Sequence, residues 1–178
     1  MLKEASADGI AAKEEGTMER GTRQGKLAGA VLIAGLLLTA TAGWSAGQVT
    51  GTYVGNGKEA KLAYALVVPH EPFDGEPAYT IILSEKNPAG VEKPDFDALF
   101  GKLGHALVIS VTRKGEIFST QVCHQALAKS GFSSVGPLLV ENFKIEGKQL
   151  SGRFYMKKED EFFGDKWKAD LTVKAALP

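Results

Sequence analysis

Three histidines and one cysteine are the side chains of this chain best suited to bind a transition metal: His70, His105, His124 and Cys123. Neutral imidazole and thiolate are the usual ligands of zinc and copper. The spacing argues against a site, because no Cys-x-x-Cys or His-x-x-x-His pair occurs and the adjacent Cys123 and His124 would point to opposite faces of a strand. We therefore expect no metal and no cofactor, ordinary surface or strand-end histidines, and a buried, inert thiol.

Nucleophilic catalysis would need a serine, or Cys123, within hydrogen-bond reach of a histidine. Ser133 and Ser134 follow His124 closely enough in the sequence to be candidates. The segment 131–136 around them matches neither the G-x-S-x-G elbow of hydrolases nor a phosphate-binding loop. The sequence therefore favours a protein that is not an enzyme. A small hydrolase or metal-binding domain that uses His124 and loop residues is an alternative hypothesis.

Two acidic stretches offer the oxygen ligands that calcium requires, Asp95 with Asp97 and residues 159–161. Neither stretch has the glycine-punctuated loop of an EF-hand. We therefore expect these carboxylates to be solvated groups in turns or at a helix cap.

Six phenylalanines fall in the predicted connections rather than in the predicted strands: Phe73, Phe96, Phe100, Phe132, Phe162 and Phe163. A loop aromatic either plugs the end of a β domain or projects as a binding anchor. Plugging is the commoner arrangement, because large exposed apolar patches are rare on soluble monomers. If several of these rings project together, they form a face for a protein partner.

The elements that must position these residues are β-strands, because from Val49 onward apolar residues recur with a period of two. The clearest predicted dry faces are Trp167, Ala169, Leu171, Val173 and Leu150, Gly152, Phe154, Met156. Eight strands are predicted, at 52–54, 62–68, 79–84, 105–112, 117–124, 138–145, 149–156 and 167–174. Short strands in this number predict an all-β fold, either an antiparallel β-sandwich or a closed barrel.

The connections between these strands carry recognisable turn signals. Asn56-Gly57 favours a type I′ hairpin between the strands at 52–54 and 62–68, and Gly115 and Gly147 mark two further hairpins. Residues 70–77 are bracketed by prolines, which disfavour strand pairing, so we expect a loop there. Residues 94–101 begin with proline, carry two early acids and end in glycine, which predicts one or two helical turns.

An uncharged run of 20 residues, 27–46, follows the cations Arg20, Arg23 and Lys26, and no basic residue comes after it until Lys58. By the positive-inside rule, the N-terminus lies in the cytoplasm and everything after residue 46 lies outside. A run of this length and composition predicts an apolar helix that is either a transmembrane anchor or the core of a signal peptide.

Composition within the run favours a signal peptide, because it ends in small residues with Ala40-Thr41-Ala42 as a cleavage site. Trp44 at the outer end fits the interfacial aromatic of an anchor instead. Residues 1–26 are expected to be a cytoplasmic or disordered leader. Translation from Met18 in place of Met1 would give a short, net-positive segment typical of a signal peptide.

The exported part, residues 47–178, has the size of one domain that can bury its own core. The whole chain is neutral, with 21 basic and 21 acidic residues. Without a basic cluster it has no electrostatic footprint for nucleic acid or anionic lipid, so membrane contact is expected only through residues 27–46 if they are retained.

Several short phrases of the sequence carry a family resemblance: Asn56-Gly57-Lys58, Glu71-Pro72-Phe73-Asp74-Gly75, Lys93-Pro94-Asp95-Phe96-Asp97, His124-Gln125-Ala126-Leu127, Ser130-Gly131-Phe132-Ser133-Ser134 and Phe163-Gly164-Asp165-Lys166-Trp167. Together, across residues 49–178, they resemble a family of small exported bacterial domains without assigned function. The resemblance implies a secreted β-rich domain and supplies no active-site residue.

These features favour a non-enzymatic, periplasmic or extracellular β domain that binds or scaffolds a protein partner through its loop aromatics. If residues 27–46 are retained, the domain is instead an accessory subunit anchored in the inner membrane. It would then dock on the periplasmic face of a membrane protein complex, with its N-terminus in the cytoplasm.

Overall fold

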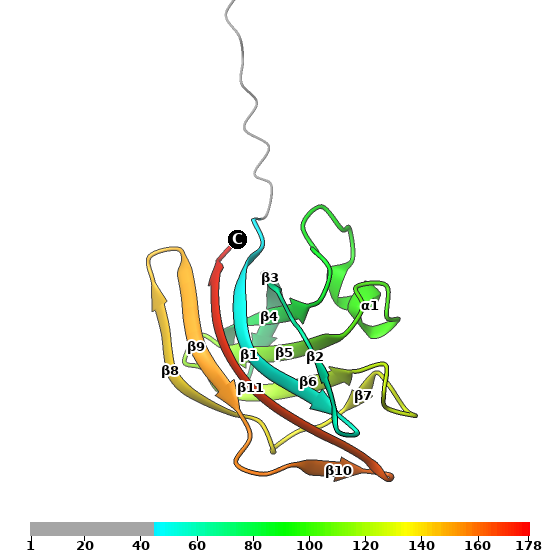
Figure 1. Ribbon diagram of the computed structural model, residues 1–178. Helices are drawn as coiled ribbons and strands as arrows, with labels where there is room; N and C mark the ends of the chain where they lie inside the picture. The colour runs from blue at the N-terminus through cyan, green and yellow to red at the C-terminus, as the bar shows by residue number, and fades with distance from the viewer. Residues whose placement is uncertain (1–44) are drawn as a thin grey trace, which may run out of the picture. The chain divides into compact units, whose positions relative to one another are not determined.

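The computed structural model describes residues 45–178, which form one antiparallel β-sheet curled into a half-barrel (Figure 1). The sheet order is β7-β6-β5-β4-β3-β1-β11-β9-β8, with β2 paired to β1 and β10 paired to β11. The strands are β1 (Gly47–Gly55), β2 (Lys58–Ala60), β3 (Tyr64–Phe73), β4 (Glu76–Ser84), β5 (Ala106–Thr112), β6 (Ile117–Cys123), β7 (Phe132–Ser133), β8 (Leu139–Glu146), β9 (Gln149–Tyr155), β10 (Asp160–Phe162) and β11 (Asp165–Ala176). The helix α1 (Pro94–Leu99) lies between β4 and β5.

The predicted leader 1–26 and most of the predicted apolar helix at 27–46 lie outside the described residues. Within residues 45–178, no helix combines the length and the hydropathy that crossing a bilayer requires.

The two-residue period of the sequence decides which side chains enter the core. Along β11, every second residue from Asp165 to Ala175 is buried, and the residues between them face outward. The partner strand β9 repeats this pattern at Leu150, Gly152 and Phe154. The predicted dry faces of both strands are therefore confirmed.

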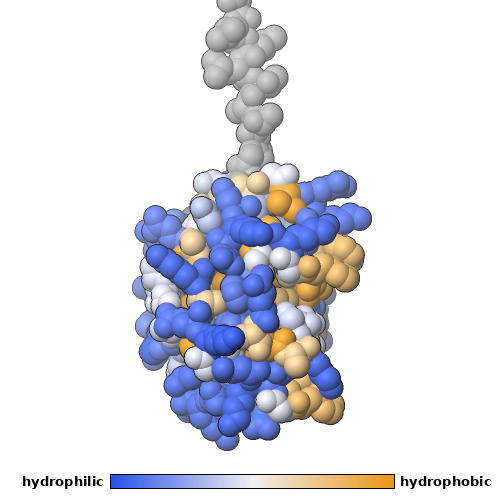
Figure 2. Space-filling model, turned by 45° about the vertical axis from the view of Figure 1, so that its right-hand side comes forward, coloured by the Kyte–Doolittle hydropathy of each residue, from blue (hydrophilic) through white to orange (hydrophobic). Residues whose placement is uncertain are grey.

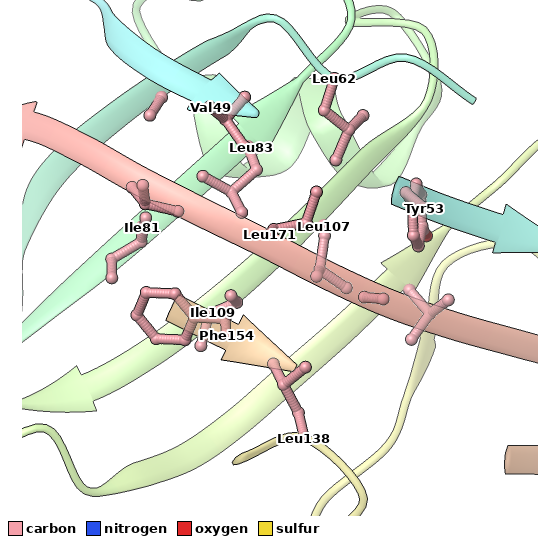
Figure 3. Close-up of a cluster of buried hydrophobic side chains, with 14 of the residues drawn as sticks. Val49, Tyr53, Leu62, Ile81, Leu83, Leu107, Ile109, Leu138, Phe154 and Leu171 are labelled. Carbon is pink, nitrogen blue, oxygen red and sulfur yellow. The ribbon is translucent and has the colours of Figure 1, made fainter. Parts of the chain in front are cut away.

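The inward faces of the strands enclose the main hydrophobic core, in which Trp167, Phe154 and Leu171 are almost completely buried. In Figure 3, side chains from β1, β4, β5, β9 and β11 point toward one another inside the curl. Each large apolar side chain buried in this way contributes about 1.5–3 kcal/mol relative to exposure, so this core is the main source of stability.

A smaller second core covers the convex side of the sheet. The segment that contains α1 packs there, with Ala98 and Leu103 against Leu66, Ile82 and Val108. All seven residues of β5 are consequently buried, because this strand has an apolar layer on both faces.

The all-β antiparallel class is confirmed, whereas the arrangement of the strands differs from the predicted sandwich or closed barrel. The eight predicted strands correspond to β1, β3, β4, β5, β6, β8, β9 and β11. They stay in one sheet because β1 pairs with β11 along its length and with β3 at Gly47 and Gln48. Curling of this single sheet, instead of stacking of two sheets, brings the apolar faces together.

The predicted loop at residues 70–77 is wrong, because β3 continues to Phe73 and pairs with β4 across a tight turn. Asp74 and Gly75 have φ values of 50° and 78°, as a two-residue type I′ hairpin requires. Pro69 is tolerated in β3 because β1 pairs only with the first two residues of β3, which leaves the far edge of β3 unpaired at this point.

Two other local predictions have mixed outcomes. Asn56 and Gly57 form the predicted turn, with φ values of 47° and 73°, but they join β1 to the short β2 instead of to the strand predicted at 62–68. The helical turns predicted at 94–101 are present as α1.

Candidate functional site

The six candidate phenylalanines lie in three separate clusters. The first is at the β3–β4 hairpin, where Phe73 stacks on Phe118 with ring centroids 4.1 Å apart and His70 meets Phe118 edge-on. Phe73 remains 40% exposed. This ring therefore partly covers its own sheet and presents only one side to solvent.

The second cluster is the pair Phe96 and Phe100, at the start and the end of α1. Their ring centroids are 4.4 Å apart, as expected for side chains four residues apart on a helix. They are 49% and 66% exposed, because Pro94 and Ala98 on the opposite side of α1 are the residues that face the sheet. These two rings therefore project into solvent and do not cover an end of the β domain.

The third cluster joins Phe132 of β7 to Phe162 and Phe163 at the β10–β11 turn. Phe132 is buried and stacks on Phe162 at 4.7 Å, so these two rings close the end of the half-barrel. Phe163 meets Phe162 edge-on and is 77% exposed, with the Lys129 ammonium 4.1 Å from its ring centroid. One ring of this cluster therefore projects.

The loop of residues 124–131 lies between the second and third clusters. A side-chain carbon on Gly131 would come within 3.3 Å of the Leu99 carbonyl oxygen at the end of α1, and Lys129 lies over Phe163. Figure 1 places α1 and the β10–β11 turn on the same side of the molecule. In Figure 2, apolar surface gathers along the right-hand side of the view, in an upper and a lower group.

A buried carboxylate fixes this loop. Asp165 accepts hydrogen bonds from the backbone N–H groups of Ala128 at 2.9 Å and Lys129 at 2.8 Å, and from the Asn56 side-chain amide at 2.8 Å. These bonds hold the pKa of Asp165 below its ordinary value, and the bond from Ala128 has the largest effect. The ionised Asp165 therefore holds the loop, and with it Lys129, against the β10–β11 turn.

The four candidate metal ligands do not assemble into a site. In the described part of the chain, no three His, Cys, Asp or Glu side chains are placed to hold a metal ion. His70 lies at the β3–β4 hairpin, away from the ring pair of His105 and His124, whose centroids are 4.4 Å apart. Cys123 is buried in the smaller core, and burial raises its pKa to about 11, as expected for an inert thiol.

His124 is held as a neutral structural residue. Its Nδ1 accepts the Ala126 N–H at 3.1 Å, so the neutral ring carries its proton on Nε2, and this buried atom has no hydrogen-bond partner among residues 45–178. Gly55 makes room for the ring, since a side-chain carbon there would lie 2.5 Å from Nδ1. Burial lowers the pKa of His124 from 6.5 to about 4, and the nearby His105 lowers it further. The backbone of Lys58 raises this pKa and offsets only part of the shift.

The predicted serine candidates lie elsewhere. The Ser134 hydroxyl donates to the Asp160 carboxylate at 3.2 Å, and the Ser133 hydroxyl donates to the Thr120 carbonyl at 3.5 Å. Asp160 also accepts the Trp167 indole N–H at 3.3 Å, so its carboxylate belongs to the packing of β10. The structure therefore brings neither serine to His124 as a nucleophile–base pair.

The depressed pKa of His124 makes a testable contribution to stability. Unfolded His124 takes up a proton near pH 6.5 and the folded form only near pH 4, so this residue favours folding above pH 6.5 and loses that contribution as the pH falls to 4. His124 lies beside the half-buried His105, where solvent screens its charge. We therefore expect His124 to contribute about 2 kcal/mol to the free energy of unfolding at neutral pH. Urea denaturation should show a smaller drop in the free energy of unfolding between pH 7 and pH 4 for His124→Gln than for the unaltered protein. Equal drops would contradict a neutral, buried His124.

Comparisons of this chain with protein-family models, with curated proteins and with solved structures found no match.

The roles of Lys129, which lies over Phe163, and of Asp165, which holds the loop of residues 124–131, were not predicted from the sequence.

Proposed function

We propose that the exported domain is a non-enzymatic binding or scaffolding module whose partner is a protein. Its contact surface consists of the exposed rings of Phe96, Phe100 and Phe163, together with Lys129, and we name this set the aromatic surface. The other three candidates, Phe73, Phe132 and Phe162, support the sheet and lie outside the proposed surface.

The observation that carries this proposal is the backbone of Phe163. Phe162 pairs with Asp165, so Phe163 and Gly164 form a two-residue turn, with φ values of 52° and 86°. A bulky residue at positive φ costs about 1–2 kcal/mol, which is why such turns favour Asn or Gly at this position. The other two turns of this kind in the domain use Asn56-Gly57 and Asp74-Gly75.

Phe163 therefore bears a conformational cost without recovering it by burial, since its ring is 77% exposed. A residue that is unfavourable for folding in this way is the kind of outlier from which a functional role is inferred. The exposed pair on α1 adds further apolar area. Aromatic anchors of this type supply much of the binding free energy of protein–protein contacts, and burial of each ring contributes about 1.5–3 kcal/mol.

The test is Phe163→Asn in the full-length chain. Asparagine suits the turn, while the contact of the ring with Lys129 is worth about 0.5–1 kcal/mol, so the free energy of unfolding should stay unchanged or rise by up to about 1 kcal/mol. Recovery of the protein partner in a pull-down from native membranes should nevertheless fall at least about tenfold. If Phe163 had only a structural role, its replacement would not reduce recovery of the partner while the free energy of unfolding stayed unchanged.

The matched control is Asp74→Asn in the β3–β4 turn, which has the same backbone geometry and lies outside the aromatic surface. It should leave both the melting temperature and the recovery of the partner unchanged. Undiminished recovery with Phe163→Asn, or an equal loss with Asp74→Asn, would contradict the proposal.

A second candidate function is that of a membrane-anchored accessory subunit. The sequence feature that favours it is the uncharged run 27–46, which is long enough to span a bilayer and ends at the residue before β1 begins at Gly47. The intact mass of the native protein decides between the two candidates, since loss of the first 42 to 46 residues would exclude the anchored form.

A further inference from the structure

A groove runs along the free edge of the sheet at β8. Strand β8 is the last in the sheet order and pairs on one side only, with β9. The groove has a volume of about 450 Å³, with Leu139 and Val140 of β8 on one wall and Glu116 and Ile117 at the start of β6 on the other. Its position leaves a strand edge open to solvent beside a recess that both apolar and polar side chains line.

Contacts at the two ends of the groove give it a direction. At one end Phe143 closes the gap to the β5–β6 turn, where a side-chain carbon on Gly115 would lie 2.7 Å from the ring of Phe143. At the other end the groove continues into a second recess of about 280 Å³, since Gly136, Leu139 and Lys157 line both. We therefore expect an occupant to extend toward Lys157.

The walls of the groove are incompletely buried. Ile117, Leu139 and Val140 are half-buried, and Val135 on the rim is 64% exposed. Apolar side chains left in this state lose further contact with water when an apolar group fills the groove.

The charge at the open end is available for a ligand. Lys157 and Lys158 line the second recess together with Glu159 and Asp160, and neither lysine belongs to an ion pair within the described residues. The nearby Asp160 carboxylate is already engaged by Trp167 and Ser134. The two ammonium groups therefore complement a carboxylate on the occupant.

The edge of β8 limits how long a paired strand can be. The register with β9 shifts between Glu141 and Lys144, and Asn142 has a φ of 54°. A bulge of this kind interrupts an edge, and charged residues beyond it oppose long edge-to-edge pairing. A second copy of this chain would need the whole edge, whereas a short peptide needs only residues 139–141.

We propose that the groove binds a short, extended peptide that adds as a strand to residues 139–141 of β8. Alternate apolar side chains of the peptide enter the groove, its backbone pairs with the free edge, and an acidic side chain or its terminal carboxylate contacts Lys157 and Lys158. This mode is strand addition, in which the backbone gives affinity and the pockets give specificity. The site shares no residue with the aromatic surface and does not depend on it.

The experiment uses a phage-displayed library of random octapeptides, selected against the full-length protein. Selection should enrich alternating apolar residues followed by Asp or Glu. The best peptide should bind at least about tenfold more weakly to Lys157→Glu and to Val135→Asp, both of which alter exposed side chains and should preserve the fold. A version of the peptide that ends in lysine should bind Lys157→Glu better than it binds the unaltered protein.

Methylation of the peptide backbone nitrogens tests the strand pairing itself. One peptide would be methylated at its odd-numbered backbone nitrogens and a second at its even-numbered ones. Because a strand directs alternate N–H groups toward its neighbour, one of the two peptides should lose binding and the other should keep it. Failure to enrich any peptide, equal binding of both methylated forms, or a dimer that Val135→Asp dissociates would overturn the proposal. Phe163→Asn serves as the control that should leave peptide binding unchanged.

Discussion

Replacing Leu171 by Asp is expected to destabilise the domain by at least about 4 kcal/mol, enough to leave much of the protein unfolded at 25 °C. Leu171 is 1% exposed and lies in the main core among the inward residues of β11. A carboxylate at this position would be buried without a partner, and a lost apolar contact would add to that cost. Urea denaturation followed by circular dichroism measures the effect.

The neighbouring residue supplies the control. Thr172 follows Leu171 on β11 but faces solvent, so Thr172→Asp should change the free energy of unfolding by less than about 1 kcal/mol. A severe loss of stability with Thr172→Asp and a mild one with Leu171→Asp would mean that β11 is turned over in the sheet, and similar melting curves would contradict the burial of Leu171. Since a shift by one residue exchanges the two faces of a strand, this pair tests the register directly.

The second large effect is expected for Gly51→Ala, at about 3–5 kcal/mol of lost stability. Gly51 pairs with Leu171 and has a φ of 123°, a region that favours glycine. A side-chain carbon there would lie 2.0 Å from the Asp170 carbonyl oxygen, which belongs to the backbone of β11 and cannot move aside. The substitution would force apart β1 and β11, the pair that joins the two halves of the sheet.

Gly57→Ala separates the two components of this cost. Gly57 has a φ of 73°, but nothing lies within 4 Å of a carbon added there. It therefore carries only the conformational penalty, about 1 kcal/mol. Equal melting temperatures of the two alanine variants would contradict the close contact between β1 and β11.

The sequence was sufficient to predict the long strands, because a period of two is a local property of the chain. The dry faces at Trp167 and Phe154 were readable for this reason. The curl of the sheet could not be predicted in this way, because it depends on which strands pair. Gln48 pairs with Tyr64 on one side and with Lys174 of β11 on the other only in the folded chain. Strands of two or three residues, such as β7, were missed because their pairing is set by a neighbour.

Pro69 and Pro72 show the same limit. Proline was taken as a reason for a loop, but its effect depends on whether an unpaired edge lies beside it, which is a tertiary property. The signal at Asp74-Gly75 was local and favoured a hairpin, so it was the better guide at this position.

The candidate site was only partly readable. The prediction that the six phenylalanines lie in connections is right for Phe100 and Phe163 and places Phe96 in the predicted helical turns, but it is wrong for Phe73, Phe132 and Phe162, which belong to β3, β7 and β10. The distinction between Phe132, which is buried, and Phe163, which projects, depends on how the β10–β11 turn folds back on β7. The loop held by Asp165 joins residues far apart in the chain, and no local spacing encodes those hydrogen bonds. The strain at Phe163 became apparent only from its backbone angle.

In-cell photocrosslinking tests most directly the claim that the aromatic surface binds a protein. A photoreactive phenylalanine derivative would replace Phe163, and the same derivative at Lys168, on the outward face of β11, would be the control. We expect one discrete protein adduct from position 163, absent from position 168 and reduced when Phe100 is also changed to serine. No adduct at position 163, or the same adducts from both positions, would contradict the proposed function.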